Sequence, residues 1–215
     1  AVMDRTDPAR RIGLYVDEWG TWYAPEPGTE PGHLYQQNTL RDALVAAVNF
    51  NIFHRHADRV RMANIAQAVN VLQAMLLTDG PAMARTPTYH AFAMYLPFQD
   101  ATVLPLDMAS PMLTAAGEGD FPAISATAAR GVDGRVRIAV ANLDQDRPHA
   151  ASIDLGTLAV TSISGQILTA AAADANNRPG APEAVTPVAY QAGRIAEGRL
   201  LLDLPAKSLV VVSLD

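Results

Sequence analysis

The stretch IGLYVDEW, residues 12–19, decides the fold of the first part of this chain. It is an aliphatic run that ends abruptly in two carboxylates and an aromatic ring, which is typical of a short, buried parallel strand that delivers polar groups at one end. Because side chains alternate along a strand, Val16 and Glu18 are predicted to share one face, and Asp17 and Trp19 the opposite face. The two neighbouring carboxylates therefore point apart.

The residues after this strand predict two strand–loop–helix units. The loop at 24–33 is too rich in Pro and Gly for regular structure. A helix is expected from about Thr39, with Asp42 three residues later in a variant of the capping box. A second strand is expected in the first half of 60–69, and a second helix over 86–99, ending near Pro97. Consecutive βα units indicate a parallel sheet.

The pattern changes after about residue 100. Short segments alternate or run apolar, separated by turn residues, at 124–128, 136–141, 150–155, 162–168, 200–204 and 209–214. Such spacing predicts an antiparallel β-sandwich, with an irregular excursion at 170–187. The expected fold class is therefore α/β plus all-β, with one domain at 1–100 and a β-sandwich domain at 101–215.

Composition excludes several classes of function. Sixteen Lys and Arg against 22 Asp and Glu give a formal net charge of -6, which argues against a nucleic-acid partner. The apolar runs are far shorter than the roughly 18 residues that span a bilayer, so no membrane role is expected. The absence of cysteine removes disulfides and thiolate chemistry, and leaves the cellular compartment open.

Glu18 is the sharpest candidate for chemistry, because a carboxylate at the carboxyl end of a parallel barrel strand lies where barrel active sites are built. Position alone also fits a strand-end Glu paired with a basic residue, which is the commoner situation. Trp19, Trp22 and Tyr23 bring three aromatic rings close to Glu18 in the sequence. Sugars stack on such rings, although aromatic side chains near a strand end usually belong to a core.

Several motifs in this chain resemble one family of glycosidases. The segments are VDEWGTWY (16–23), EPGTEPGHLYQQNTLRDALVAA (26–47), FHRHADRVRMANIAQAVNVLQA (53–74), TPTYHAFAMY (86–95), SGQILTA (164–170) and LPAKSLVVVSL (204–214). Together they are similar to the α-L-arabinofuranosidases of glycoside hydrolase family 51. The resemblance covers nearly the whole chain, but it corresponds only to the C-terminal portion of such an enzyme.

The resemblance implies a (β/α)8 TIM barrel, of which this chain holds the last two βα units, followed by the β-sandwich. It places the nucleophile of a retaining mechanism at Glu18. The family's acid/base Glu follows an Asn, and no Asn-Glu dipeptide occurs in this chain. Asp17 points to the wrong face, and Glu26 and Glu30 lie on a Pro-rich loop that gives no reason for a raised pKa. The acid/base is therefore expected outside this chain, which alone is expected to be inactive.

Two more residues acquire a role from the resemblance. Gln67 matches a substrate hydrogen-bonding residue, with the alternative that its amide satisfies backbone groups at a strand end. Trp22 matches a residue beside the leaving group, with simple loop packing as its alternative. The family uses no cofactor and no metal, and the His54-x-His56 pair fits the last turn of a helix better than a metal site, because no third ligand has suitable spacing.

Two hypotheses of different classes follow. In the first, the chain is part of a retaining arabinofuranosidase that removes terminal arabinofuranosyl residues from arabinan, arabinoxylan or arabino-oligosaccharides. In the second, it is a non-catalytic fragment whose β-sandwich binds carbohydrate or serves in assembly. The resemblance also implies a homo-oligomer, with hexamers common in the family, and it favours a cytoplasmic location. The preferred linkage does not follow from the sequence.

Overall fold

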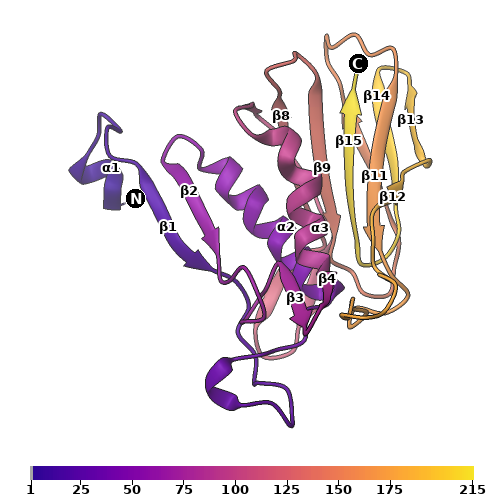
Figure 1. The fold of residues 1–215 in the computed structure, drawn as a ribbon. Coiled ribbons are helices and arrows are strands. Elements are labelled where there is room, and N and C mark those ends of the chain that lie inside the picture. Colours follow the sequence, from indigo (N-terminus) through magenta and orange to yellow (C-terminus); the bar gives the residue numbers. More distant parts are fainter. Residues whose placement is uncertain (1) are drawn as a thin grey trace.

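The computed structural model describes residues 2–215, and Figure 1 shows the two parts of the chain side by side. The N-terminal part holds helices, two short sheets and the long loop after the first strand. Its elements are α1 (Val2–Thr6), β1 (Leu14–Trp19), the 3-10 turn η1 (Pro31–His33), α2 (Leu40–Arg55), β2 (Val60–Ile65), β3 (Leu76–Asp79), β4 (Ala82–Arg85), α3 (Pro87–Tyr95) and the 3-10 turn η2 (Leu96–Phe98).

Strands β1 and β2 form the predicted parallel pair, with Leu14 opposite Val60 and Trp19 opposite Ile65. The expectation that β1 is buried was wrong, since Leu14 is 41% exposed and Tyr15 is 57% exposed. Among the described residues β1 pairs with β2 alone and the helices cover only one face of the pair, so the other face meets solvent.

Strand β2 matches the strand predicted in the first half of 60–69, and the chain then leaves the sheet after Ile65 and folds into a hairpin. Strands β3 and β4 of this hairpin were not predicted. Gly80 connects them with a φ of +52°, a left-handed conformation that glycine adopts without steric cost. The Asp79–Gly80–Pro81 breaker is therefore the turn of a hairpin.

Both predicted helices begin where their caps indicate. Thr39 precedes α2, and the carboxylate of Asp42 accepts hydrogen bonds from the Thr39 backbone at 2.7 Å and from its hydroxyl at 3.0 Å. Thr86 precedes α3, where its hydroxyl accepts a bond from the Tyr89 amide and Pro87 occupies the first turn. Local sequence alone specifies these two starts.

The C-terminal part is the expected antiparallel β-sandwich. Its strands are β5 (Thr102–Leu104), β6 (Met112–Ala115), β7 (Gly119–Pro122), β8 (Ile124–Arg130), β9 (Val136–Asn142), β10 (His149–Asp154), β11 (Ile163–Thr169), β12 (Val188–Ala189), β13 (Gly193–Ala196), β14 (Arg199–Leu204) and β15 (Ser208–Leu214). One sheet has the order β12-β11-β15-β9-β8-β5, and the other has the order β10-β14-β13. Strands β6 and β7 form a separate hairpin.

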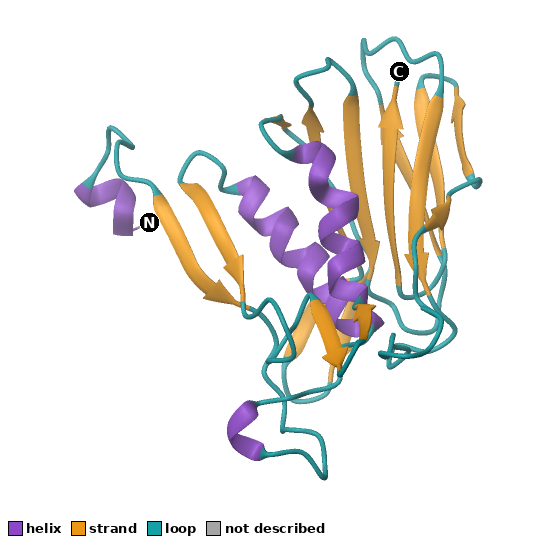
Figure 2. Cartoon of the chain, in the orientation of Figure 1, coloured by secondary structure: helices purple, strands orange, loops and turns teal. Residues whose placement is uncertain are grey.

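The six-stranded sheet has a hydrophobic core on each face. Val140, Val210 and Val212 face the smaller sheet and pack with Leu200 and Leu202 of β14. Alternate positions on the other face pack against the two helices, which lie along that face of the sheet (Figure 2). That second core contains Ala129, Ala139, Ala141, Leu168, Leu209 and Val211 of the sheet, with Leu40, Leu44 and Met94 of the helices. The helices and the sandwich are thus joined by one shared apolar layer.

The predicted excursion at 170–187 has no helix or strand, yet it is firmly attached. Its carbonyls at Ala173 and Ala175 accept hydrogen bonds from the first amides of α2, each at 2.9 Å. Glu183 forms an ion pair with Arg85 at 2.9 Å and lies 3.2 Å from the His90 ring. The excursion therefore ties the sandwich to the hairpin and to both helices.

The folded chain should lose stability as the pH falls from 7. Burial lowers the pKa of His54 and of His90, so the unfolded chain takes up protons near its ordinary value of about 6.5 while the folded chain resists. The Arg137 guanidinium lowers the pKa of Asp133 to about 2, and the Asp146 amide lowers that of Asp144, which adds a second loss below about pH 4. Urea unfolding at several pH values measures both losses, and a stability maximum below pH 5 would contradict this expectation.

Candidate active site

Glu18 is the penultimate residue of β1, and its side chain is exposed. The next residue, Trp19, packs against the helices, with its ring 5.5 Å from that of Phe50 and 6.0 Å from that of Phe92. The register of β1 against β2 shifts between Val16 and Trp19, so strand alternation does not by itself fix the direction of the exposed Glu18 side chain.

Trp22 and Gln67 lie at the same edge of the parallel pair as Glu18. Trp22 follows β1 in the long loop and is 65% exposed, and Gln67 stands two residues beyond β2 and is also exposed. The Ala66 amide donates a hydrogen bond to the Trp19 carbonyl at 2.8 Å, which holds the two strand ends together. Since β2 ends at Ile65, strand alternation does not fix the direction of the Gln67 side chain.

Two buried glutamines fix the loop that joins Glu18 to Trp22. Gln73 is fully buried, and its Oε1 accepts a hydrogen bond from the Thr21 amide at 2.9 Å. The Gln36 Oε1 accepts from the Tyr23 amide at 2.9 Å, and its Nε2 donates to the Thr21 carbonyl at 3.2 Å. The amides on both sides of Trp22 are therefore held by side chains from distant parts of the sequence.

Asp42 completes this polar network beneath the loop. Its Oδ1 accepts a hydrogen bond from the Thr21 hydroxyl at 2.9 Å, while its other oxygen caps α2. The Gln73 Nε2 donates to the Asp42 carbonyl at 2.8 Å and to the Thr88 hydroxyl at 3.1 Å. Sequence reasoning gave Gln36 and Gln73 no role, although both stand inside the quoted motifs. The first turns of α2 and α3 thus anchor the loop beside Glu18.

Replacing Gln73 by Leu should destabilise the chain markedly. The change leaves the Thr21 amide without its partner and removes the donor to the Asp42 carbonyl and the Thr88 hydroxyl, and a buried polar group left unpaired costs about 1–3 kcal/mol. Gln37→Leu is the matched control, because the Gln37 side chain bonds to no residue among 2–215, and we expect a change within about 0.5 kcal/mol. The free energy of unfolding in urea measures both, and equal effects would refute the role of the network.

The other acidic residues near the loop have structural partners. The Glu26 carboxylate accepts a hydrogen bond from the Gln37 amide at 3.2 Å, and that of Glu30 accepts one from the Gly32 amide at 3.4 Å. No described contact joins either carboxylate to Glu18. Across residues 2–215, no group of three or more His, Asp or Glu side chains is arranged to hold a metal ion.

Two residues of the His54–Arg61 run make structural contacts. His54 lies in the last turn of α2, where its ring stacks on Phe98 at 5.3 Å and its Nδ1 lies 3.3 Å from the Thr127 hydroxyl. Arg59 is buried and pairs with Asp7 at 2.6 Å, which binds the N-terminal segment to the start of β2. No helix within residues 2–215 has both the length and the apolar character needed to cross a bilayer.

Comparisons with known proteins identify the family of this chain. A family model described as the α-L-arabinofuranosidase C-terminal domain matches residues 17–208. An intracellular exo-α-L-arabinofuranosidase of Bacteroides ovatus is 44% identical over 214 residues, which cover 100% of this chain and 42% of the relative. The chain thus spans about two fifths of the length of this curated relative.

Solved structures give the same result. The family 51 arabinofuranosidase of Xanthomonas axonopodis pv. citri superposes with a TM-score of 0.96 and 52% identity, covering 100% of this chain and 43% of that one. A family 51 α-L-arabinofuranosidase of Bifidobacterium longum superposes with a TM-score of 0.84 and 29% identity, covering 99% and 44%. The chain belongs to the family of α-L-arabinofuranosidase C-terminal domains, and its likeness to the family 51 enzymes lies in their C-terminal portion.

Proposed function

We propose that this chain is the C-terminal portion of a retaining α-L-arabinofuranosidase, in which Glu18 is the nucleophile. The observation that carries the proposal is the position of three residues at the carboxyl edge of a parallel strand pair: Glu18 near the end of β1, Trp22 on the following loop that buried glutamines hold, and Gln67 just after β2. That edge is where barrel enzymes build their active sites. Its substrates are terminal, non-reducing arabinofuranosyl residues on arabinan, arabinoxylan or arabino-oligosaccharides.

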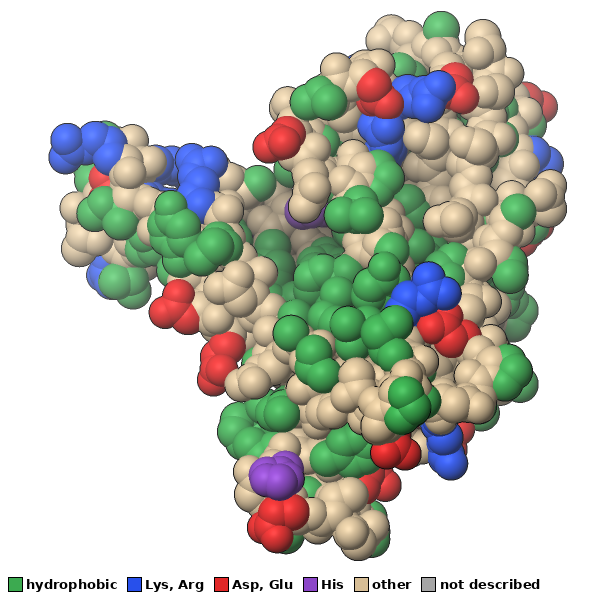
Figure 3. Space-filling view, viewed as in Figure 1, with side chains coloured by type: hydrophobic (Ala, Val, Ile, Leu, Met, Phe, Trp, Pro, Cys, Tyr) green, Lys and Arg blue, Asp and Glu red, His purple; other side chains and the backbone are tan. Residues whose placement is uncertain are grey.

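The exposed apolar surface of β2 and α3 is consistent with packing against further units of a larger barrel. An apolar cleft of about 330 Å³ lies between β2, α2 and α3, and Figure 3 shows hydrophobic side chains gathered beside it. Met62 and Leu96 at this surface are 45% and 58% exposed. Large exposed apolar patches usually mark an interface. Further βα units of a (β/α)8 barrel would cover this cleft, with residues 1–100 as its last two units and 101–215 as the sandwich domain.

The proposed mechanism divides the work between two carboxyl groups. Glu18 attacks the anomeric carbon and forms a glycosyl-enzyme ester, while an acid/base about 5–5.5 Å away protonates the leaving oxygen and then activates water. Gln67 would hydrogen-bond the sugar, and the exposed Trp22 ring would stack on the group that leaves. The acid/base would come from the remainder of the barrel.

Hydrolysis of a 4-nitrophenyl arabinofuranoside tests the proposal. We expect no turnover by the 215-residue chain alone, and turnover when it is mixed or co-expressed with a separately produced N-terminal barrel portion of a family 51 enzyme. The Bacteroides ovatus enzyme, used whole, is the positive control for the assay. A mixture that assembles but does not release nitrophenol would contradict the proposed function and favour a non-catalytic role for the sandwich.

Two further expectations belong to the same proposal. The Bacteroides ovatus relative is named intracellular, which supports a cytoplasmic location for this protein. A homo-oligomer, with a hexamer as the form that the family resemblance implies, is expected for the assembled enzyme. Light scattering after gel filtration measures its mass.

A further inference from the structure

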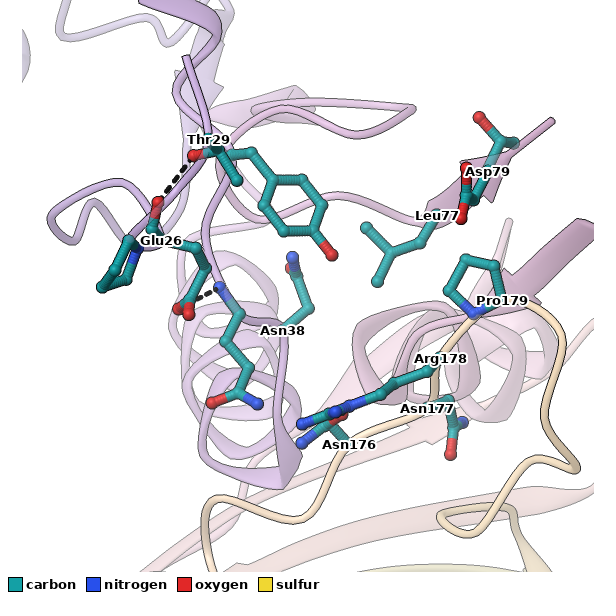
Figure 4. Close-up of a pocket in the computed structure, with 13 residues that line it drawn as sticks. Glu26, Thr29, Asn38, Leu77, Asp79, Asn176, Asn177, Arg178 and Pro179 are labelled. Atoms are coloured by element: carbon teal, nitrogen blue, oxygen red, sulfur yellow. Dashed lines mark hydrogen bonds between the residues drawn. The ribbon is translucent and has the colours of Figure 1, made fainter. Parts of the chain in front are cut away.

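A polar pocket of about 570 Å³ lies between three segments that are far apart in the sequence. Figure 4 shows its walls: Glu26 and Asn38 from the loop before α2, Leu77 and Asp79 from the β3–β4 hairpin, and Arg178 from the excursion at 170–187. Its lining includes neither Glu18 nor Trp22 nor Gln67. The pocket is therefore a second candidate binding site, separate from the residues proposed for hydrolysis.

Polar groups in this pocket lack partners within residues 2–215. Asn38 is buried, and its Nδ2 donates to the carbonyls of Gln36 and Leu72, so this residue shapes the wall and offers no free group to a ligand. The Asp79 carboxylate and the Tyr35 hydroxyl bond to no described side chain or backbone group. Arg178 uses only its Nε, which donates to Asn176 Oδ1 at 3.0 Å. Donors and acceptors for a ligand thus stand together.

The wall that carries Arg178 is held rigidly. Asn177 is buried, and its Nδ2 donates to the carbonyls of Arg85 and Val185, each at 2.9 Å. Its Oδ1 accepts from the amides of Ala184 and Val185 at 2.9 and 2.8 Å. The ion pair between Glu183 and Arg85 fixes the same segment to the hairpin. A pre-formed wall lowers the entropy that binding costs.

The chemistry of the lining selects a neutral, polyhydroxylated ligand. Glu26 and Asp79 outnumber the single cation Arg178, which disfavours an anion. Pro179 adds apolar surface beside these polar groups, as sugar rings require. We infer that the pocket binds a neutral oligosaccharide. If the proposed function holds, this oligosaccharide is an arabinan-type chain. The pocket would then hold a part of that chain away from the bond that is cleaved.

NMR titration of the 215-residue chain with arabinotriose tests this inference. We expect backbone amide shifts at residues 37, 176 and 178, and binding weakened about tenfold or more by Arg178→Ala, because a charge-assisted hydrogen bond is lost. Arg194→Ala is the matched control, since Arg194 is an exposed arginine on β13, outside the pocket. Glu18→Ala should leave the affinity unchanged.

The inference would be overturned by no binding, by equal binding of the Arg178→Ala and Arg194→Ala variants, or by displacement of the sugar by inorganic phosphate. Amide shifts confined to Trp22 and Gln67 that vanish in the Glu18→Ala variant would also overturn it. Such shifts would place the sugar at the candidate active site and not in the pocket. None of these results bears on nitrophenol release by the assembled enzyme. Separate experiments therefore test oligosaccharide binding at the pocket and the proposed hydrolysis.

Discussion

Glu18→Ala, in an assembled enzyme that contains this chain, is expected to lower turnover of an aryl arabinofuranoside by several orders of magnitude while substrate still binds. The change removes the group that forms the covalent intermediate and leaves the acid in place. Glu30→Ala is the matched control, because Glu30 is an exposed loop carboxylate outside both the candidate active site and the polar pocket. We expect that variant to keep its activity.

Azide distinguishes a nucleophile from an acid/base at position 18. In the Glu18→Ala variant a small anion can occupy the vacated space and attack the anomeric carbon directly. One displacement then yields an arabinosyl azide of inverted configuration. Loss of an acid/base would instead spare substrates with good leaving groups, and azide would give the retained product. An azide of retained configuration from Glu18→Ala, identified by NMR, would overturn the assignment.

The second large effect is expected from cutting the chain after residue 100. The fragment should not unfold cooperatively as a monomer, because α2 and α3 share their core with the six-stranded sheet. Leu40, Leu44 and Met94 would lose that cover, and each buried side chain of this kind contributes about 1.5–3 kcal/mol. Three such losses approach the whole stability of a typical domain, about 5–15 kcal/mol.

The intact 215-residue chain, unfolded under the same conditions, is the control for this cut. The fragment also exposes the unpaired edges of β1 and β2, which invites aggregation. Urea unfolding followed by circular dichroism, with light scattering to report the mass, measures both consequences. A cooperative transition of a monomeric fragment would show that the first hundred residues form an independent unit.

Local sequence determined a large part of this fold. The Thr39 and Thr86 caps follow from hydrogen bonds between near neighbours, and the strand ending at Trp19 and most sandwich strands follow from the local pattern of side chains, although their partner strands are distant in the sequence. The motif around Glu18 can be recognised from the sequence for the same reason, because the strand end, the loop and its aromatic rings are adjacent in the chain. The position of Glu18 near the end of a strand is thus a property of consecutive residues.

Only the tertiary structure decided what surrounds that motif. Gln73 bonds to Thr21 from 52 positions away, and the pocket joins Glu26 to Arg178 across the whole chain. Neither Gln36 nor Gln73 differs in the sequence from an exposed surface glutamine, because an amide acquires its role from the partners that folding brings within reach. Burial then makes those partners obligatory, since an unpaired polar group away from water is costly. Periodicity cannot report such pairs, because it records spacing along the chain and not distance across it.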